Sequence, residues 1–389
     1  MSEIAPLPIV ESKITLSPCG IQSIREKSDR PIQIPTQPPL RWHFDPQVLE
    51  VEQRILFEQG FNYVGHELLV PNLGDYHVPS QLNNAKILVR NQHGVELLSN
   101  ICRHRQAIML EGRGTVKNIV CPLHRWSYRL DGTMLGAPHF PENPCLPLNK
   151  TPLQNWNGLL FASQRNVAKD LAAMPALKEL DFSNYLLNRV EVEEYAFNWK
   201  TFIEAYQEDY HVEPFHPGLG KFVDCNDLHW KFGDWYCLQT VGVQRDLRKV
   251  GSATYGKWQE QVQRYHHGDM PRFGAIWLTL YPNIMIEWYP GTLVVSSVIP
   301  NGTDACTHIA EFYYLEDIVL FERDFIAAEK AAYHETAKED NIICQKIHQG
   351  RKYLYQQGLE ESGPYQSPTE DGLQHFHEFL LRQLTPHVK

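Results

Sequence analysis

Clusters of basic residues are missing from this sequence of 389 residues, which carries a formal net charge of −10. Proteins that bind nucleic acids hold the phosphate groups with closely spaced Lys and Arg side chains, and an acidic surface repels such polyanions. The composition therefore argues against a nucleic-acid-binding function, and we expect no nucleic acid among the partners.

Long apolar runs are also missing. The most apolar region, residues 274–300, is interrupted by three prolines, an Asn and a Glu, whereas a membrane-spanning helix needs about 20 consecutive apolar residues. The first ten residues, MSEIAPLPIV, have neither the basic nor the apolar segment of a secretory signal. We expect no membrane span, no secretion and a cytoplasmic location.

Cysteine is sparse: eight residues are scattered along the chain, which suits reduced thiols better than a disulfide framework. Low-complexity tracts and short repeats are absent from the sequence, and 43% of the residues are hydrophobic, as in ordinary globular proteins. Because the chain exceeds the size at which one hydrophobic core usually stops growing, we expect two folded domains.

The predicted fold class is α+β, with three stretches of different character. Residues 1–58 combine a Pro- and Ser-rich arm with a helical pattern, and we expect them to pack on the last domain. Residues 59–168 hold short β-rich runs separated by Gly, Asn, Pro and His, the pattern of a small all-β domain. Residues 169–389 mix strand and helix patterns, which predicts an antiparallel sheet flanked by helices.

The β-rich stretch contains four metal-ligand side chains, Cys102, His104, Cys121 and His124, in the pattern C-x-H-x16-C-x2-H. Zinc fingers usually separate a pair of Cys from a pair of His, whereas each unit here supplies one of each. A Rieske [2Fe-2S] cluster has two Cys on one iron and two His on the other, so it needs two such mixed loops. The pattern therefore favours a Rieske cluster over zinc, or over unconnected core Cys and surface His.

The residues next to these ligands suit the same interpretation. Trp126 is placed to shield a cluster, and Tyr128 is placed to donate a hydrogen bond near a sulfur atom. The segments CRHR, CPLHRWSYRLDGTMLGAP and WNGLLFAS resemble the Rieske domain of the Rieske non-haem iron oxygenases. Gln106 stands where that family generally has Gly, a departure that leaves the four ligands in place.

A second group of candidate ligands lies in NWKTFIEAYQEDYHVEPFH, residues 198–216. Two His and one carboxylate form the facial triad of non-haem Fe(II) oxygenases, which leaves positions open for dioxygen. His211 and His216 are the predicted histidine ligands, and the carboxylate must come from elsewhere. The alternative to a metal site is that these two are ordinary core or surface histidines.

We expect the first part of this segment to be a helix over residues 198–213. Glu204, Glu208 and His211 would then share one face of the helix. Pro214 would end the helix, so that His216 could approach the metal from a loop.

The segment also resembles the catalytic-domain motif of the same family, and the resemblance implies further residues. It implies that the third iron ligand is an Asp on a long downstream helix. The matching position in KEDNIICQKIHQG is Asp340, with Glu339 as the alternative.

The resemblance implies a role for Glu208 as well. In the family, an acidic residue at this position contacts a cluster histidine of a neighbouring subunit, because the two metal sites of one chain are too far apart for useful electron transfer. The cluster histidine would be His104 or His124, and the assembly would be a homotrimer with head-to-tail contacts.

The activity implied by the resemblance is that of a terminal oxygenase. Electrons would pass from NAD(P)H through a ferredoxin or a flavin or iron–sulfur reductase to the [2Fe-2S] cluster, and then to a mononuclear Fe(II) that uses O2. The substrate would be a small aromatic or an N-methylated or quaternary ammonium compound, which is hydroxylated, dihydroxylated or dealkylated. Glu208, in place of the commoner Asp, favours the ammonium class. A Rieske electron-transfer protein without oxygenase activity is the alternative.

Several other residues are weaker candidates. Four large side chains on the apolar segment 274–300 are candidates to line a substrate cavity, although such residues more often belong to a core: Trp277, Tyr281, Met285 and Trp288. Four histidines lack ligand spacing, and we expect them to be solvated: His266, His267, His375 and His377.

Overall fold

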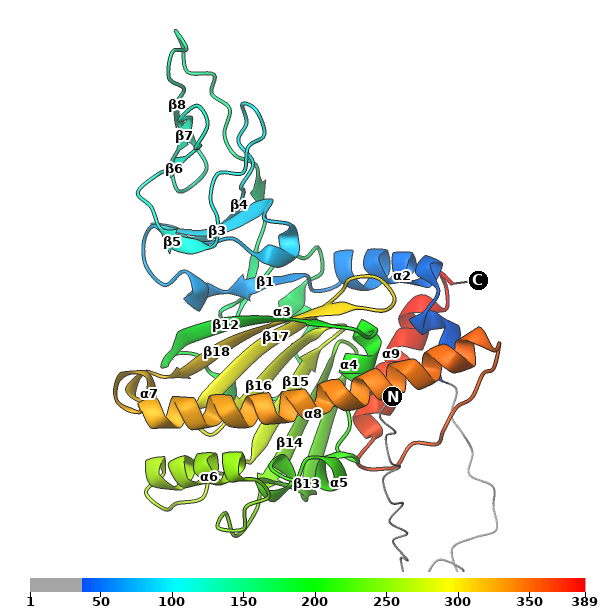
Figure 1. Ribbon diagram of the computed structural model, residues 1–389. Helices are drawn as coiled ribbons and strands as arrows, with labels where there is room; N and C mark the ends of the chain where they lie inside the picture. Colours follow the sequence, from blue (N-terminus) through cyan, green and yellow to red (C-terminus); the bar gives the residue numbers. More distant parts are fainter. Residues whose placement is uncertain (1–36, 389) are drawn as a thin grey trace, which may run out of the picture.

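The computed structural model describes residues 37–388 (Figure 1). Most of the predicted arm lies in residues 1–36, outside the described residues. The predicted helix that follows the arm is present as α2, Pro46–Glu52, and a π-helical segment, Gln53–Glu58, continues it. Asp45 starts this helix because its side chain accepts a hydrogen bond of 2.9 Å from the backbone N–H of Gln47.

Strands β1 to β11 form the predicted all-β part, in three small antiparallel sheets. The first has the order β1-β11-β10, the second β5-β2-β3-β4-β9 and the third β6-β7-β8. Their bounds are Tyr63–His66 (β1), Asp75–His77 (β2), Lys86–Asn91 (β3), Gly94–Ser99 (β4), Arg113–Thr115 (β5), Ile119–Val120 (β6), Ser127–Tyr128 (β7), Met134–Gly136 (β8), Lys150–Thr151 (β9), Gln154–Trp156 (β10) and Leu159–Phe161 (β11).

The remaining strands form one antiparallel sheet of seven strands, in the order β12-β18-β17-β16-β15-β14-β13. The central strands are buried along their length, which explains why their sequences are nearly continuous apolar runs. The bounds are Tyr185–Tyr195 (β12), Val223–Gly233 (β13), Tyr236–Val243 (β14), Ala275–Leu280 (β15), Ile284–Tyr289 (β16), Thr292–Pro300 (β17) and Cys306–Leu315 (β18).

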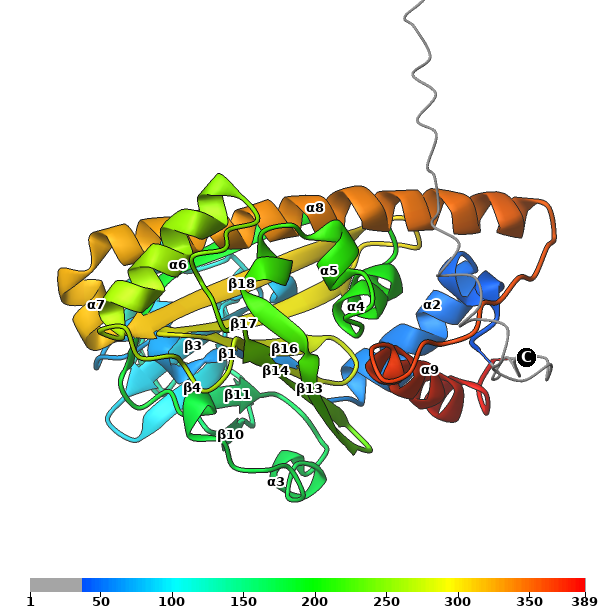
Figure 2. The same ribbon diagram turned by 90° about the horizontal axis from the view of Figure 1, so that it is seen from below.

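Helices flank this sheet. The long helix α8 crosses one of its faces, and α6 lies beside α8 on the same side (Figures 1 and 2). The bounds of the helices after α2 are Val167–Asp170 (α3), Trp199–Tyr206 (α4), Val212–Phe215 (α5), Ala253–Tyr265 (α6), Glu316–Phe321 (α7), Arg323–Gln356 (α8) and Asp371–Leu384 (α9). The predicted α+β fold, with an all-β domain before a sheet flanked by helices, is confirmed. Among the helices of residues 37–388, none is long and apolar enough to cross a membrane.

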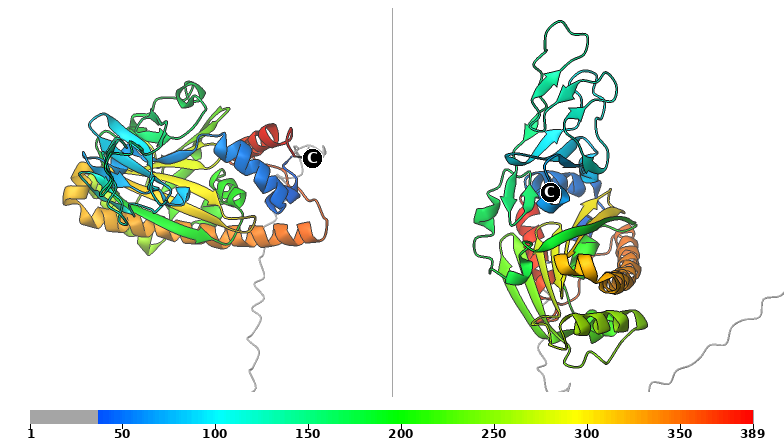
Figure 3. Two further views of the ribbon diagram at one scale, coloured as in Figure 1. Left: turned by 90° about the horizontal axis from the view of Figure 1, so that it is seen from above. Right: turned by 90° about the vertical axis from the view of Figure 1, so that its left-hand side faces the viewer.

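The all-β part stands at one edge of the larger sheet, and the sheet β6-β7-β8 lies at its far tip (Figures 1 and 3). A buried polar contact joins the two parts: the hydroxyl of Tyr63 in β1 donates a hydrogen bond of 2.9 Å to Glu311 in β18. The tip lies far from the helices α4, α5 and α8, which are on the other side of the edge strand β12 (Figure 1).

The predicted helix over residues 198–213 is wrong in its length. Helix α4 ends at Tyr206, and the next helix, α5, begins only at Val212. The backbone N–H of Asp209 donates to the carbonyl oxygen of Thr369 at 2.9 Å, a bond across the fold that takes the place of helical pairing. Pro214 does not end a helix, because it lies in the first turn of α5, where a backbone N–H is not needed.

Candidate metal and active sites

The four predicted cluster ligands lie on two loops that repeat one backbone pattern. The N–H of Cys102 donates to the carbonyl of Ala107 at 2.9 Å, and the N–H of Cys121 donates to the carbonyl of Trp126 at 2.8 Å. The residue four positions after each Cys has a positive φ, +57° at Gln106 and +61° at Arg125. Glycine adopts this conformation at least cost, which gives a physical reason for the Gly that the family generally has at the position of Gln106.

The ligand atoms of these loops converge. The Nδ1 atoms of His104 and His124 lie 3.2 Å apart, a separation that suits two imidazoles bound to one metal ion. Cys102 and Cys121 are each only 1% exposed, whereas His124 lies at the surface. The donor set therefore fits a cluster whose thiolate side is buried and whose histidine side faces outward.

Two aromatic residues complete this site. The ring of Trp126 stacks on that of His104, with the centroids 4.7 Å apart and the planes within 9°. The hydroxyl of Tyr128 lies 3.8 Å from the sulfur of Cys102 and accepts a hydrogen bond from the N–H of Arg103 at 3.3 Å. Because that acceptor role leaves the hydroxyl proton free, Tyr128 can donate it to the sulfur.

The second predicted site comes together around three atoms from α8 and the segment after α4. Nε2 of His216 lies 3.1 Å from Nε2 of His211 and 3.0 Å from Oδ1 of Asp340. Within residues 37–388, these three side chains form a group of potential ligands whose ligand atoms all lie within 4.8 Å of one another. Ligands about 2.1 Å from a single ion have separations of this size when the angles between them are near 90°.

The environment of Asp340 also fits a metal ion. Its Oδ1 atom is buried and lies 3.0 Å from Nε2 of His216 and 3.6 Å from Nε2 of His211, but it accepts no well-directed hydrogen bond within the described residues. Leaving a buried carboxylate oxygen without a hydrogen bond costs free energy. A divalent cation held by His211, His216 and Asp340 would remove that cost, and a donor set of two histidines and one carboxylate is the one that non-haem Fe(II) uses.

Two further carboxylates orient the histidines. Glu208 contacts Nδ1 of His211 and also accepts a hydrogen bond of 3.0 Å from its backbone N–H. Glu339 lies 2.7 Å from Nδ1 of His216. Both rings therefore turn their Nε2 atoms toward Asp340, which favours Asp340 over Glu339 as the third ligand.

The acidic surroundings also affect protonation. Burial lowers the pKa of His211, but the Asp340 and Glu208 carboxylates outweigh it and raise the pKa to about 10. The pKa of Asp340 is lowered, because its interactions with His211 and His216 exceed the effect of burial. A metal ion must therefore displace protons from this site when it binds.

A cavity with a volume of about 110 Å³ adjoins the triad. Of the four predicted lining residues, Trp277 lines it, whereas the other three belong to the hydrophobic core: Tyr281, Met285 and Trp288. The wall also includes three carboxylates that the sequence reasoning did not assign to a site: Asp209, Glu287 and Glu329. The sequence contains one indication that Glu287 is unusual: it is the single charged residue in the buried strand IMIEWY.

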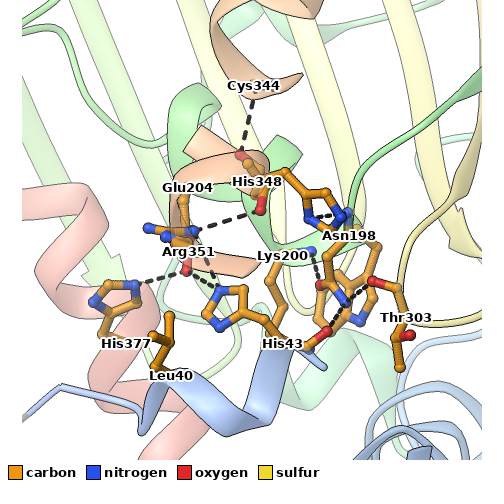
Figure 4. A network of polar contacts seen from close by, with 12 residues as sticks. Leu40, His43, Asn198, Lys200, Glu204, Thr303, Cys344, His348, Arg351 and His377 are labelled. Atoms are coloured by element: carbon orange, nitrogen blue, oxygen red, sulfur yellow. Dashed lines mark hydrogen bonds and ion pairs between the residues drawn. The ribbon is translucent and has the colours of Figure 1, made fainter. Parts of the chain in front are cut away.

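Glu204 does not point toward the metal site with Glu208 and His211, as the predicted helix face required. It lies in a buried polar network, shown in Figure 4, where its carboxylate contacts His43, Arg351 and His377. His377 is therefore not solvated as predicted, because it is only 6% exposed.

Residues 198–200, the NWK sequence that starts this segment, also have a structural role. Asn198 caps α4 through its side chain, and Lys200 forms a buried ion pair of 2.7 Å with Glu52 of α2. The N-terminal segment is thus anchored to the helix that precedes the metal site.

Comparisons with known proteins agree with this arrangement. Residues 61–152 match the family described as the Rieske [2Fe-2S] domain, and residues 181–385 match the catalytic domain of the ring-hydroxylating alpha subunit. The chain is 57% identical to putrescine 2-hydroxylase of Ralstonia nicotianae over 89% of its own length and 95% of that protein. It is 27% identical to the chloroplastic choline monooxygenase of Spinacia oleracea, over 97% of this chain and 85% of that protein.

Solved structures share the fold at lower identity. A quaternary ammonium Rieske monooxygenase superimposes with a TM-score of 0.72 at 17% identity, covering 90% of this chain and 96% of the other. Naphthalene 1,2-dioxygenase from a Rhodococcus species gives a TM-score of 0.66 at 17% identity, covering 91% and 95%. With both domain families matched in order, the enzyme interpretation is confirmed over the electron-carrier alternative: this chain belongs to the Rieske non-haem iron oxygenases, as a terminal oxygenase component with a [2Fe-2S] domain and a non-haem iron domain.

Proposed function

We propose that this oxygenase hydroxylates a small aliphatic diamine, with putrescine as the first candidate substrate. The observation that carries the proposal is the charge of the cavity beside the triad. Five carboxylates line it, and no Lys or Arg is among its lining residues in the described chain: Glu208, Asp209, Glu287, Glu329 and Asp340. The 57% identity to a putrescine 2-hydroxylase supports the same substrate class.

An ammonium substrate explains this wall better than a neutral aromatic ring does. Buried carboxylates are costly unless they are paired with positive charge, and a cationic ligand supplies that charge. The aromatic residues of the wall can contact both the methylene chain and the ammonium groups of a diamine. We therefore rank aliphatic amines ahead of aromatic substrates, and single hydroxylation ahead of dihydroxylation.

The proposed ligands of the mononuclear iron are His211, His216 and Asp340. The iron, when bound, supplies activation of O2 at the positions that three protein ligands leave open. Glu208 and Glu339 hold the two imidazoles through their Nδ1 atoms, so that both present Nε2. The cavity wall excludes water and holds the substrate in one orientation, which selects the carbon that reacts.

In balanced form, the reaction replaces one C–H hydrogen by a hydroxyl group. One O2, two electrons and two protons are consumed, and one water is released. We propose that the electrons come from NAD(P)H through a ferredoxin or a flavin or iron–sulfur reductase, and enter at the cluster ligated by Cys102, His104, Cys121 and His124.

We further propose that electrons reach the iron between subunits of a homotrimer. The cluster loops lie at the tip of the all-β part, remote from α8 in the same chain (Figure 1). The tip exposes apolar side chains beside the histidines, with Leu123 56% and Phe140 47% exposed. Tyr210, two residues after Glu208 in the sequence, is 60% exposed. Such surfaces suit a head-to-tail contact in which Glu208 meets His104 or His124 of a neighbour.

The proposed activity can be tested with purified, iron-loaded protein and a surrogate reductase. We expect NADH and O2 consumption that depends on 1,4-diaminobutane and is matched by formation of its monohydroxylated product. Choline, carnitine and a benzoate would be tested in parallel. Product from the aromatic acid, with none from any amine, would contradict the diamine proposal.

Iron content provides an independent check of the site. The metal sites require about three iron atoms per chain, two in the cluster and one mononuclear. Preparations that hold only two, while showing full cluster absorption, would contradict the mononuclear site.

A further inference from the structure

One carboxylate in the cavity wall has a fixed orientation but no positive partner. Glu287 lies on β16, opposite Trp277 of β15, and is only 5% exposed. Its hydrogen bond to the hydroxyl of Tyr289 connects it to neither the proposed metal ligands nor the carboxylates that orient them. Glu287 adds to the negative charge of the cavity but has no role in holding the metal.

Hydrogen bonds hold the Glu287 carboxylate in one orientation. The indole N–H of Trp277 donates to the hydroxyl of Tyr289 at 3.0 Å, and this hydroxyl lies 2.8 Å from Oε2 of Glu287. An indole N–H can only donate, so the hydroxyl of Tyr289 accepts from it and gives its own proton to Glu287. Glu287 is therefore held as an acceptor.

Three of the other four carboxylates of the cavity lie beside basic side chains. Glu208 contacts His211, and Asp340 lies beside both histidines. Asp209, like Glu287, forms no ion pair within residues 37–388, and its carboxylate accepts a hydrogen bond from the Gln239 side chain. Glu287 differs from Asp209 in its place beside the aromatic rings around Tyr289.

Glu329 accepts a hydrogen bond from Tyr314 and lies 3.7 Å from the guanidinium of Arg189. Within residues 37–388, Glu287 forms no ion pair. Burial, together with the nearby carboxylates of Glu329 and Asp340, raises the pKa of Glu287 to about 7, although hydrogen bonds from Tyr289 and Tyr333 lower it. A buried carboxylate in this position is stabilised by a cation that arrives with the ligand.

The side chains around Glu287 suit an ammonium group. The ring of Tyr289 meets those of Trp258 and Trp277 edge to face, with centroids 6.0 and 6.5 Å apart. The hydroxyl of Tyr206, another residue of the cavity wall, is buried and has no hydrogen-bond partner in the described chain. An ammonium group offers three donors, and this end of the cavity combines a carboxylate, a free hydroxyl and aromatic faces.

We propose that Glu287 is the residue that selects for positive charge in the substrate: it binds an ammonium group of the amine through an ion pair, with Tyr206 as a second acceptor. This inference rests on the proposed amine substrate and adds the residue that recognises it. It assigns Glu287 to binding, whereas His211, His216 and Asp340 would hold the metal.

Anaerobic calorimetric titration of the iron-loaded enzyme tests this role without turnover. The probes are 1,4-diaminobutane and the neutral 1,4-butanediol, which has the same chain length. Glu287→Gln keeps the shape of the side chain and removes its charge. We expect Kd for the diamine to rise about ten- to hundredfold, with Kd for the diol changed less than threefold.

Two more variants make the result specific. Glu213→Gln removes a carboxylate from the exposed surface of α5, outside the cavity wall, and should leave Kd for the diamine unchanged. Glu287→Asp keeps the charge but shortens the side chain, and its Kd should lie between those of wild type and Glu287→Gln. It also serves as the test variant if Glu287→Gln does not fold, which cluster absorption and iron content will show.

The outcomes separate the two proposals. Wild-type enzyme that binds and hydroxylates 1,4-diaminobutane, together with an unchanged Kd in Glu287→Gln, would overturn the role of Glu287 alone. An equal loss of affinity for diamine and diol would also overturn it, because charge would not be what Glu287 recognises. Wild-type enzyme that neither binds nor hydroxylates any amine would overturn the amine substrate and the role of Glu287 with it.

Discussion

Asp340 and His216 face each other across the proposed iron site, with Oδ1 of Asp340 3.0 Å from Nε2 of His216. The neighbouring Glu339 lies 2.7 Å from the other ring nitrogen, Nδ1. Successive side chains on a helix point in directions about 100° apart, so the two acids reach opposite sides of one imidazole. This division gives adjacent carboxylates different tasks: Asp340 for the metal, and Glu339 for the position of the histidine.

Variants of the two acids should therefore differ in iron content. Asp340→Ala removes a proposed ligand, and we expect iron to fall from about three atoms per chain to about two, with the cluster absorption kept. Glu339→Gln should keep the mononuclear iron but weaken its binding about ten- to hundredfold, because the histidine is less well oriented. Elemental analysis and chelator competition measure both effects. Full iron content in Asp340→Ala would exclude that residue as a ligand.

Glu208 should matter for electron transfer more than for metal binding. Glu208→Gln can still hold His211 by a hydrogen bond, so we expect iron content and cluster absorption to stay the same. Loss of the charged contact between subunits should slow oxidation of the reduced cluster by substrate and O2, which rapid-mixing absorption follows in a single turnover. An unchanged rate would rule out the proposed bridge, whereas a monomeric mass in solution would rule out the trimer itself.

Tyr128 should tune the reduction potential of the cluster. Its hydroxyl lies 3.8 Å from the sulfur of Cys102, and a hydrogen bond to sulfur stabilises the more negative, reduced cluster. Tyr128→Phe should lower the potential by on the order of 50 mV, since a hydrogen bond worth about 1 kcal/mol corresponds to that shift for one electron. Protein-film voltammetry measures the change. A potential equal to that of wild type would show that the hydroxyl does not act on the cluster.

The sequence was most informative where function depends on local spacing. The two cluster loops are short, so C-x-H and C-x2-H already define which atoms can meet. His211 and His216 are five residues apart, and they meet even though the predicted continuous helix is wrong. Here the residue types and spacing were sufficient, and the exact backbone path was not needed.

Side chains whose partners lie far away in the sequence could not be placed in this way. Glu204 has suitable helical spacing to Glu208, but α4 ends at Tyr206 and its carboxylate meets His43 and His377 instead. The role proposed for Glu287 likewise depends on strand pairing with Trp277 and on the hydroxyl of Tyr289. Such contacts arise from tertiary packing, which residue periodicity does not encode.

A buried acid between the two domains makes a prediction about stability. Glu311 accepts hydrogen bonds from Tyr63 and Tyr313, but burial dominates and raises its pKa to about 7. Its usual value, 4.5, is expected in the unfolded chain. Between these pH values the native state binds the proton more tightly than the unfolded state does. The contribution of Glu311 to the free energy of unfolding therefore falls as pH rises from about 4.5 to 7.

Glu311→Gln removes this titration and keeps a hydrogen-bond acceptor for the tyrosines. The quantity to compare is the free energy of unfolding of the variant minus that of wild type. We expect this difference to be larger at pH 8 than at pH 5 by on the order of 3 kcal/mol. Denaturant unfolding of both proteins at both pH values measures the effect, and the difference between them cancels the titration of Asp209 and Glu287. If this difference in unfolding free energy is the same at pH 5 and pH 8, Glu311 keeps an ordinary pKa. Its buried contact with Tyr63 would then hold a carboxylate that is charged at both pH values.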